Sequence, residues 1–288
     1  YDLCHCFFGF PSGLLGWWFA NRQPYIVSLR GSDVPGFNVR FQAHYVALTP
    51  IFKRIWRRAA AVVTNSTGLR DLAQKTAPDL DFKIIPNGVD TDEFFPGPTR
   101  TGKPFTALCV SRLIERKGVH FLIDAWPRVH DAVPDARLVI VGEGDMQQRL
   151  QDQARSLGID SSVDFHGRLA HEALPAVYQS ADVFVLPSMN EGMSNTVLEA
   201  MASGLPIIST DTGGSAELLS DNALLVKQRA PGSISDALLT LARDDDQRHV
   251  RAKASRAKAV TNSWHAIAER YRALYEQGAD CQGCTSPE

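Results

Sequence analysis

Residues 182–210, DVFVLPSMNEGMSNTVLEAMASGLPIIST, read in order as an apolar run, a polar loop, a helical stretch and a second apolar run. The two apolar runs, 182–186 and 206–210, predict buried strands. Ser194 is a favourable N-cap for the helix between them, and Gly204 supplies the residue at which that helix stops. Strand, helix and strand in this order predict one βαβ unit of a parallel sheet.

The same alternation of apolar runs and helical patterns extends along the chain in both directions. The runs are apolar throughout instead of alternating with polar residues, which is typical of strands covered by helices on both faces. We therefore expect an α/β protein with doubly wound parallel sheets, in which ligands bind at the carboxyl ends of the strands. The other predicted strands are 25–29, 61–65, 82–85, 105–110, 137–141, 163–166 and 223–227, and the first half has predicted helices around 49–60 and 67–76.

A stretch rich in proline and glycine separates two sets of strands. Residues 85–104, IPNGVDTDEFFPGPTRTGKP, contain four prolines and three glycines and read as a linker. We therefore divide the chain into a partial first Rossmann-like domain (1–91), a second Rossmann-like domain (92–265) and a C-terminal helix with a flexible tail (266–288). Because the chain opens at Tyr1 with no Met, we expect the first domain to be truncated.

The composition excludes several classes of protein. Hydrophobic residues make up 44% of the 288 residues and charged residues 22%, as in ordinary globular proteins. The formal net charge of -2 gives no field that attracts nucleic acid, so nucleic acid is not an expected partner. The apolar stretch 7–20 is interrupted by glycine and proline and is shorter than the ~20 residues of a transmembrane helix. We expect a cytoplasmic protein.

Three features have alternative interpretations. The basic residues from Arg248 to Lys258 suit a solvated helix face better than a contact with anionic lipid at the inner face of the membrane. The aromatic residues of the stretch 7–20 suit apolar packing of a strand–helix unit better than an acceptor platform. Cys281 and Cys284 form a C-x-x-C without a second pair to complete a zinc site, so their role stays open, as does the oligomeric state.

Cations gather in the loop that follows the predicted strand 105–110. Arg112 and Lys117 stand at the carboxyl end of this strand, where a diphosphate is expected. A guanidinium binds phosphate oxygens through paired hydrogen bonds, and an ammonium adds a mobile point charge. A solvated basic loop fits the same spacing equally well.

The helix after Ser194 places further polar groups at the same edge of the sheet. Its first amides, near Asn195 and Thr196, point toward the ligand side, and a helix N-terminus attracts phosphate. Glu199 lies four residues further on, ~6 Å along the helix axis, where its carboxylate can accept hydrogen bonds from ribose hydroxyls. Glu191 precedes the helix, so the two glutamates bracket the site.

Glu191 and Glu199 have the spacing of the E-x7-E signature, and this segment resembles the retaining family 4 glycosyltransferases of the GT-B fold. The loop of Arg112 and Lys117 resembles the diphosphate clamp of that family. The resemblance implies two Rossmann-like domains that face a cleft, with the first one incomplete here. Further matching segments follow in the same order, namely Val141-Gly142-Glu143-Gly144, Phe165-His166-Gly167, Pro187-Ser188 and Gly213-Gly214-Ser215-Ala216-Glu217.

The resemblance also implies an activity. The chain would transfer a sugar from a nucleoside-diphosphate sugar to a glycan, a lipid-linked molecule or a small molecule, with retention and without a metal or other cofactor, in polysaccharide biosynthesis. Glu191 would be the catalytic residue. The donor-binding residues would be Arg112, Lys117, Gly142, Met193, Ser194, Asn195, Thr196 and Glu199.

The acceptor side departs from the family pattern. Arg30 stands where members of the family have a histidine before the glycine, here Gly31, and Asp33 follows. The glycine-rich loop that lines the diphosphate site in the family would lie before Tyr1. A chain without that loop could bind donor without turning it over.

Other functions were weighed against this one. Gly142 and Gly144 begin a dinucleotide fingerprint, but Gln147 occupies the third glycine position. The D-x-D pairs of metal-dependent transferases, Asp79/Asp81 and Asp90/Asp92, fall in predicted loops. A nucleotide-sugar epimerase and a non-catalytic donor-binding fragment remain the alternatives.

Overall fold

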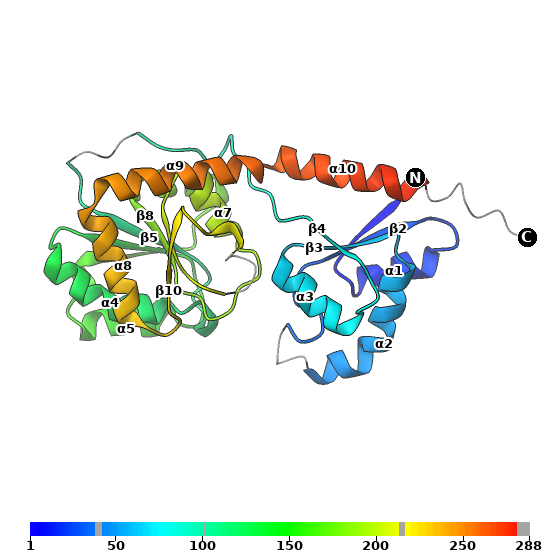
Figure 1. The fold of residues 1–288 in the computed structure, drawn as a ribbon. Helices are drawn as coiled ribbons and strands as arrows, with labels where there is room; N and C mark the ends of the chain where they lie inside the picture. Colours follow the sequence, from blue (N-terminus) through cyan, green and yellow to red (C-terminus); the bar gives the residue numbers. More distant parts are fainter. Residues whose placement is uncertain (38–41, 99, 101, 213–216, 281–288) are drawn as a thin grey trace, which may run out of the picture. The chain divides into compact units, whose positions relative to one another are not determined.

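The computed structural model describes residues 1–37, 42–98, 100, 102–212 and 217–280. The chain divides into two compact units, one formed by Tyr1–Asn87 with His265–Glu288 and the other by Gly88–Trp264. Each unit is built around a parallel sheet of its own (Figure 1). The divisions that we predicted at 91/92 and 265/266 lie a few residues from these limits, and the last helix groups with the first unit.

The first unit has four parallel strands with helices on both faces. Its elements are β1 (Cys4–Phe7), α1 (Ser12–Phe19), β2 (Tyr25–Leu29), α2 (Gln42–Arg58), β3 (Ala61–Thr64), α3 (Thr67–Thr76), β4 (Phe82–Ile84) and, from His265 onward, α10 (Trp264–Asp280). The sheet order is β1-β2-β3-β4. Because successive side chains of a strand point to opposite faces, Val27 packs with α2 and α3, whereas Ile26 packs with Leu274 of α10.

The second unit has six parallel strands. Its elements are β5 (Thr106–Val110), α4 (Val119–Ala132), β6 (Arg137–Val141), α5 (Gln147–Ser156), β7 (Val163–Gly167), α6 (Leu174–Gln179), β8 (Val183–Leu186), α7 (Asn195–Ala202), β9 (Ile207–Thr210), β10 (Ala223–Val226), α8 (Pro231–Arg243) and α9 (Asp245–Thr261). The sheet order is β10-β9-β8-β5-β6-β7. The direction of chain progression reverses between β5 and β8, and the loops beyond such a reversal form the usual ligand site of an open α/β sheet.

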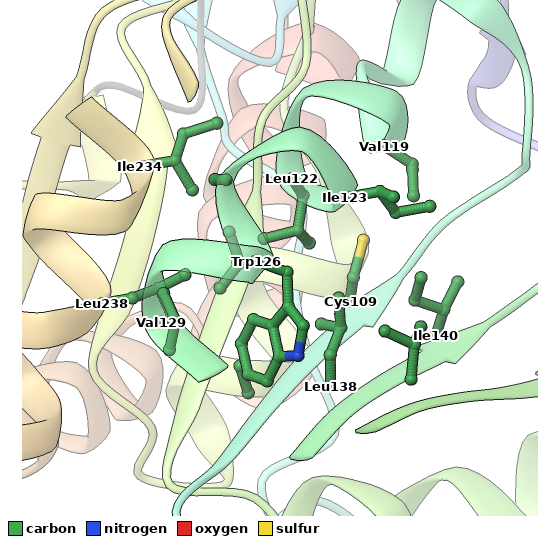
Figure 2. Close-up of a cluster of buried hydrophobic side chains, with 14 of the residues drawn as sticks. Cys109, Val119, Leu122, Ile123, Trp126, Val129, Leu138, Ile140, Ile234 and Leu238 are labelled. Atoms are coloured by element: carbon green, nitrogen blue, oxygen red, sulfur yellow. The ribbon is translucent and has the colours of Figure 1, made fainter. Parts of the chain in front are cut away.

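The core of the second unit forms on both faces of its sheet. Figure 2 shows the cluster on one face, where Trp126 of α4 lies beside Cys109 of β5 and Leu138 of β6. The Trp126 indole is fully buried and donates a hydrogen bond to Ser162 Oγ at 3.0 Å. Leu108, the neighbour of Cys109 in β5, packs on the other face with residues of α7. Both faces of the strand are therefore apolar, as the continuous apolar run predicts.

All of the strands predicted from apolar runs are present. The helix predicted around 49–60 begins earlier, at Gln42. The stretch 7–20 includes the end of β1 and all of α1, so the strand–helix interpretation is correct for the backbone. It is wrong for several side chains, because Phe7, Trp18 and Phe19 are at least half exposed.

Most basic residues of α9 bond neighbouring segments of the second unit instead of forming a solvated face, whereas Lys253 is exposed. Arg256 donates hydrogen bonds to the backbone carbonyls of Thr91, Phe94 and Ala202. Arg251 likewise bonds the carbonyls of Asp221 and Ala223, and Lys258 forms an ion pair with Asp221. Asp244 caps the helix by accepting from the Gln247 amide. The charge run therefore holds α9 to its neighbours.

None of the described helices combines the length and the apolar composition that crossing a bilayer requires.

A polar network joins β1, β2 and α10 inside the first unit. His5 lies 2.7 Å from both the Tyr275 hydroxyl and Ser28 Oγ, and Ser28 lies 3.1 Å from the Tyr271 hydroxyl. Burial, with a smaller contribution from the positive charge of Arg30, lowers the pKa of His5 to about 4. His5 is therefore neutral in the folded protein at neutral pH.

We expect the first unit to lose stability as the pH falls from about 6.5 to about 4. In this range the unfolded chain binds a proton at His5 and the folded chain does not, so acid favours unfolding. The His5→Gln variant should show a flatter pH dependence of the denaturation midpoint in this range. An unchanged slope in the variant would assign the acid sensitivity to other groups.

Candidate functional site

The loops that follow β5 and β8 lie against each other at the carboxyl edge of the second sheet. The Met189 amide donates to the Arg116 carbonyl at 2.9 Å, and the Arg116 guanidinium donates to the Asn190 carbonyl at 2.9 Å. Gly118 has a φ of +66°, and a Cβ at this position would lie 2.1 Å from the Pro187 carbonyl oxygen. The contact between the loops therefore requires glycine at residue 118.

This contact brings the predicted cation and the predicted catalytic carboxylate together. Lys117 Nζ forms an ion pair with Glu191 Oε1, and the two side chains are 12% and 9% exposed. Ser188 Oγ donates to the same oxygen at 2.9 Å, and the Thr210 hydroxyl donates to the Ser188 carbonyl. A buried carboxylate needs such partners, because desolvating an unpaired charge is costly. Sequence reasoning named Ser188 only as part of a matching segment, without its contact to Glu191, and missed Thr210.

The second predicted cation has a different environment. Arg112 is exposed, and its guanidinium makes no hydrogen bond or ion pair with the part of the chain that the structure describes, whereas its carbonyl accepts from the Ile114 amide at 3.0 Å. Its guanidinium donors therefore remain available for a ligand from solution. Lys117 would have to share its charge between Glu191 and such a ligand.

Two glycines hold the Arg112 loop beside the start of α5. A Cβ on Gly142, whose φ is +132°, would lie 1.9 Å from the Ser111 carbonyl oxygen, and one on Gly144 would lie 2.2 Å from that of Leu113. The Ser111 and Leu113 amides donate to the Val141 and Glu143 carbonyls at 3.0 and 2.9 Å. Gly142 thus shapes the loop by close backbone approach.

The helix after the β8 loop forms as the sequence predicts. Ser194 has an extended backbone at the N-cap, although its side chain makes no capping hydrogen bond, and Gly204, with a φ of +71°, follows the C-cap. The Gly204 and Leu205 amides donate to the Met201 and Ala200 carbonyls, which is a Schellman ending. Met193 and Ser194 are buried, Asn195 is exposed, and the Thr196 hydroxyl lies 3.0 Å from that of Ser194.

Glu199 of α7 lines a separate small cavity. The cavity has a volume of about 230 Å³, and its wall includes Glu93, His171, Asn195 and Trp264. Burial raises the pKa of Glu199, although a hydrogen bond from the Tyr178 hydroxyl at 2.8 Å opposes the shift. His171 Nε2 lies 3.4 Å from Glu93 Oε2 beside it. Tyr178 and His171 carry no motif in the sequence that would mark them as partners of Glu199.

In the first unit, the residues predicted for the acceptor side organise two loops. Asp33 is buried, and it accepts hydrogen bonds from the backbone amides of Gly9, Arg30 and Gly31 at 2.7 to 2.9 Å. Burial raises the pKa of Asp33, and these amides oppose the shift. Arg30 donates to Asn87 Oδ1 at 2.8 Å, and its guanidinium lies over the Phe7 ring. Their role toward an acceptor remains a prediction.

The described residues contain no cluster of three or more His, Cys, Asp or Glu side chains that could hold a metal ion. Asp79 of the first D-x-D pair forms an ion pair with Arg57 at 3.0 Å, and Asp90 of the second caps the amides of Asp92 and Glu93. Both pairs have structural contacts. Cys281, Cys284 and residues 213–216 lie outside the described residues.

Comparison with known proteins gives consistent matches over the chain. The family model for glycosyl transferases group 1 matches residues 90–258, and that for Glycosyltransferase Family 4 matches residues 1–93. A GDP-mannose-dependent alpha-(1-6)-phosphatidylinositol monomannoside mannosyltransferase of Mycobacterium tuberculosis is 33% identical over 242 residues, which cover 76% of this chain and 62% of the relative. A D-inositol 3-phosphate glycosyltransferase of Corynebacterium jeikeium is 32% identical and covers 75% and 57%. The chain thus spans about three-fifths of the length of these relatives.

Solved structures share the fold. HepE of Anabaena in complex with UDP superimposes with a TM-score of 0.83 at 22% identity, covering 96% of this chain and 79% of that one. Sucrose-phosphate synthase of Thermosynechococcus elongatus gives a TM-score of 0.80 at 24% identity, covering 96% and 73%. The two parallel-sheet units and these neighbours confirm the predicted GT-B architecture.

We expect Gly118→Ala to destabilise the second unit by at least about 3 kcal/mol, because it combines an unfavourable positive φ with a clash against the Pro187 carbonyl. Gly158→Ala is the matched control, since Gly158 has a φ of +68° with nothing within 4 Å of a Cβ. That variant should lose only about 1 to 2 kcal/mol. Chemical denaturation measures both losses, and equal values would contradict the importance of the close approach.

Proposed function

This chain belongs to the glycosyl transferases group 1 family, and from that premise we propose that it transfers a sugar from a nucleoside-diphosphate sugar to an acceptor. The observation that carries the proposal is the contact between Lys117 and Glu191 at the carboxyl ends of β5 and β8. A cation for the diphosphate and a carboxylate for the sugar then stand on either side of the bond to be broken. In this proposal the second unit binds the donor, and the first unit serves the acceptor.

Each group of the site has a part in binding the donor. Arg112 and Lys117 bind the diphosphate, for which the exposed guanidinium of Arg112 has unused donors. Glu199 accepts from the ribose hydroxyls in its cavity, and Glu191 addresses the transferred sugar. Residues Met193 to Thr196, which lead into α7, lie between the two glutamates in the sequence and contribute to donor binding.

The arrangement suits the charge that develops during the reaction. As the bond between the sugar carbon and the diphosphate oxygen breaks, negative charge grows on the diphosphate and positive charge on the sugar carbon. Arg112 and Lys117 stabilise the leaving diphosphate, and the Glu191 carboxylate stabilises the sugar. The acceptor oxygen forms the new bond to the sugar carbon, and the proton of its hydroxyl passes to the departing diphosphate oxygen. We propose that transfer retains the anomeric configuration, as the resemblance to the retaining family 4 glycosyltransferases implies. We also propose that it needs no metal, because side-chain cations stand where the diphosphate would bind.

Relatives and neighbours indicate the classes of donor and acceptor. By their names, the mycobacterial relative uses GDP-mannose and acts on a phosphatidylinositol monomannoside, whereas HepE is in complex with UDP. We propose a glycan or lipid-linked acceptor for this chain, and a cytoplasmic location with peripheral contact at the inner face of the membrane. Such a contact would bring a soluble donor to a lipid-linked acceptor.

The first test is calorimetric titration with UDP, GDP and ADP in the presence of a chelator. We expect one diphosphate to bind selectively, and the double variant Arg112→Ala/Lys117→Ala to bind it at least about tenfold more weakly, because charge-assisted hydrogen bonds are lost. Arg128→Ala removes an exposed cation paired with Asp236 on α8 and is the matched control.

Several results would change the assignment. Equal affinity of the wild type for a nucleoside and its diphosphate would contradict the role of the two cations. Interconversion of the donor sugar without transfer would indicate an epimerase. Binding without hydrolysis or transfer would indicate a non-catalytic donor-binding protein.

A second prediction concerns the ion pair. Glu191→Gln keeps the shape of the side chain and removes its charge, so Lys117 no longer divides its charge between a carboxylate and the diphosphate. We expect tighter binding of the nucleoside diphosphate together with turnover at least about 100-fold lower. Weaker diphosphate binding in this variant would show that Glu191 acts on the nucleotide and not on the sugar.

A further inference from the structure

Tyr178 is a buried tyrosine whose hydroxyl is directed at Glu199. Its side chain is fully buried, and its ring lies 5.7 Å from that of Phe94 and 5.9 Å from that of Phe184. The hydroxyl donates to Glu199 Oε2 at 2.8 Å, and the Thr196 carbonyl is a more distant acceptor at 3.4 Å. Full burial and these ring contacts restrict the ring, which keeps the hydroxyl beside Glu199.

This hydrogen bond determines which part of the carboxylate can bind a ligand. Oε2 faces Tyr178, so Oε1 and the remaining lone pair of Oε2 are the acceptor positions left for a group in the cavity. The cavity, at about 230 Å³, is smaller than the ~300 Å³ of a pocket for a drug-sized ligand, so it suits part of a nucleotide. Two adjacent hydroxyls on a sugar ring match two acceptor positions on one carboxylate.

The hydrogen bond also affects the charge of Glu199. Burial and the negative charge of Glu93 raise the pKa of Glu199, whereas the Tyr178 hydroxyl and the nearby His171 lower it. A hydrogen bond from the Tyr178 hydroxyl favours the ionised carboxylate, which is the form that accepts hydrogen bonds. Without this hydrogen bond, Glu199 would retain a proton to higher pH.

We propose that Tyr178 is a positioning residue that orients Glu199 toward the vicinal hydroxyls of the donor's ribose. This inference rests on the proposed function, because it assumes a nucleoside diphosphate as ligand. Tyr178 itself does not touch the ligand, and its effect passes through Glu199.

The test uses the ribonucleoside diphosphate that binds the wild type. Its affinity is compared with the affinities of its 2′-deoxy and 3′-deoxy analogues, in the wild type and in Tyr178→Phe. We expect the wild type to prefer the ribonucleotide, and the variant to lose about tenfold of this preference with little change in its affinity for the deoxy analogues. When the pH is lowered, the variant should lose its remaining preference for the ribonucleotide at a higher pH than the wild type does, because Glu199 takes up a proton earlier. A tyrosine that only supports the fold would weaken all ligands alike.

Two controls separate positioning from folding. Tyr25→Phe removes a buried hydroxyl that donates to the Ile55 carbonyl at 2.5 Å in the first unit, and it should leave the preference unchanged. Glu199→Asp keeps the charge and Tyr178 but shortens the side chain by one methylene, which withdraws the carboxylate from the Tyr178 hydroxyl and from the ribose. It should lose the preference as well, and it provides the test if Tyr178→Phe does not fold.

The outcomes are distinct. An unchanged preference in Tyr178→Phe would overturn the role of Tyr178 and leave the proposed function intact. An unchanged preference in Glu199→Asp would overturn this inference together with the ribose contact of Glu199, while the diphosphate contacts stand. A wild type that binds ribonucleotide and deoxynucleotides equally would overturn this inference while the diphosphate contacts stand. A wild type that binds no nucleoside diphosphate would overturn both.

Discussion

The close backbone approach of three loops is the constraint on which the candidate site depends. The Gly118 backbone lies against Pro187, and Gly142 lies against Ser111, at distances that no side chain permits. These contacts place a loop from β5 beside a loop from β8, next to the point where the order of the sheet reverses. Lys117 and Glu191, far apart in the sequence, meet as a consequence.

The charges of the site are balanced inside the second unit. Glu191 is paired with Lys117 and accepts a hydrogen bond from Ser188, so its negative charge can be buried without a ligand. Glu199 is supported by Tyr178 in the same way. Arg112 is the exposed exception. The polar groups are therefore preorganised, and a ligand that carries negative charge would complete the balance at Arg112.

The first unit uses its polar residues mainly to hold its own loops and its last helix. Asp33 accepts hydrogen bonds from three backbone amides in the loops after β1 and β2, and His5 connects β1 with Tyr275 of α10. A residue predicted for the acceptor side, such as Asp33, therefore has a structural role that is visible only in the contacts. The Phe7 ring of β1 lies beside His5 and under the Arg30 guanidinium, whereas Trp18 and Phe19 of α1 are exposed.

The sequence by itself determined the fold class, nearly all of the strands, and both glutamates with their neighbouring cation loop. Apolar runs, helix caps and glycines are local signals, because a strand or a helix end depends on residues within a few positions. Local signals could not predict that α9 turns its arginines inward, that Trp18 stays exposed, or that Tyr178 supports Glu199. Those features depend on which elements pack together, and the partners come from distant parts of the chain. Only the tertiary structure decides such contacts, because burial and hydrogen-bond geometry arise when the sheets and helices assemble.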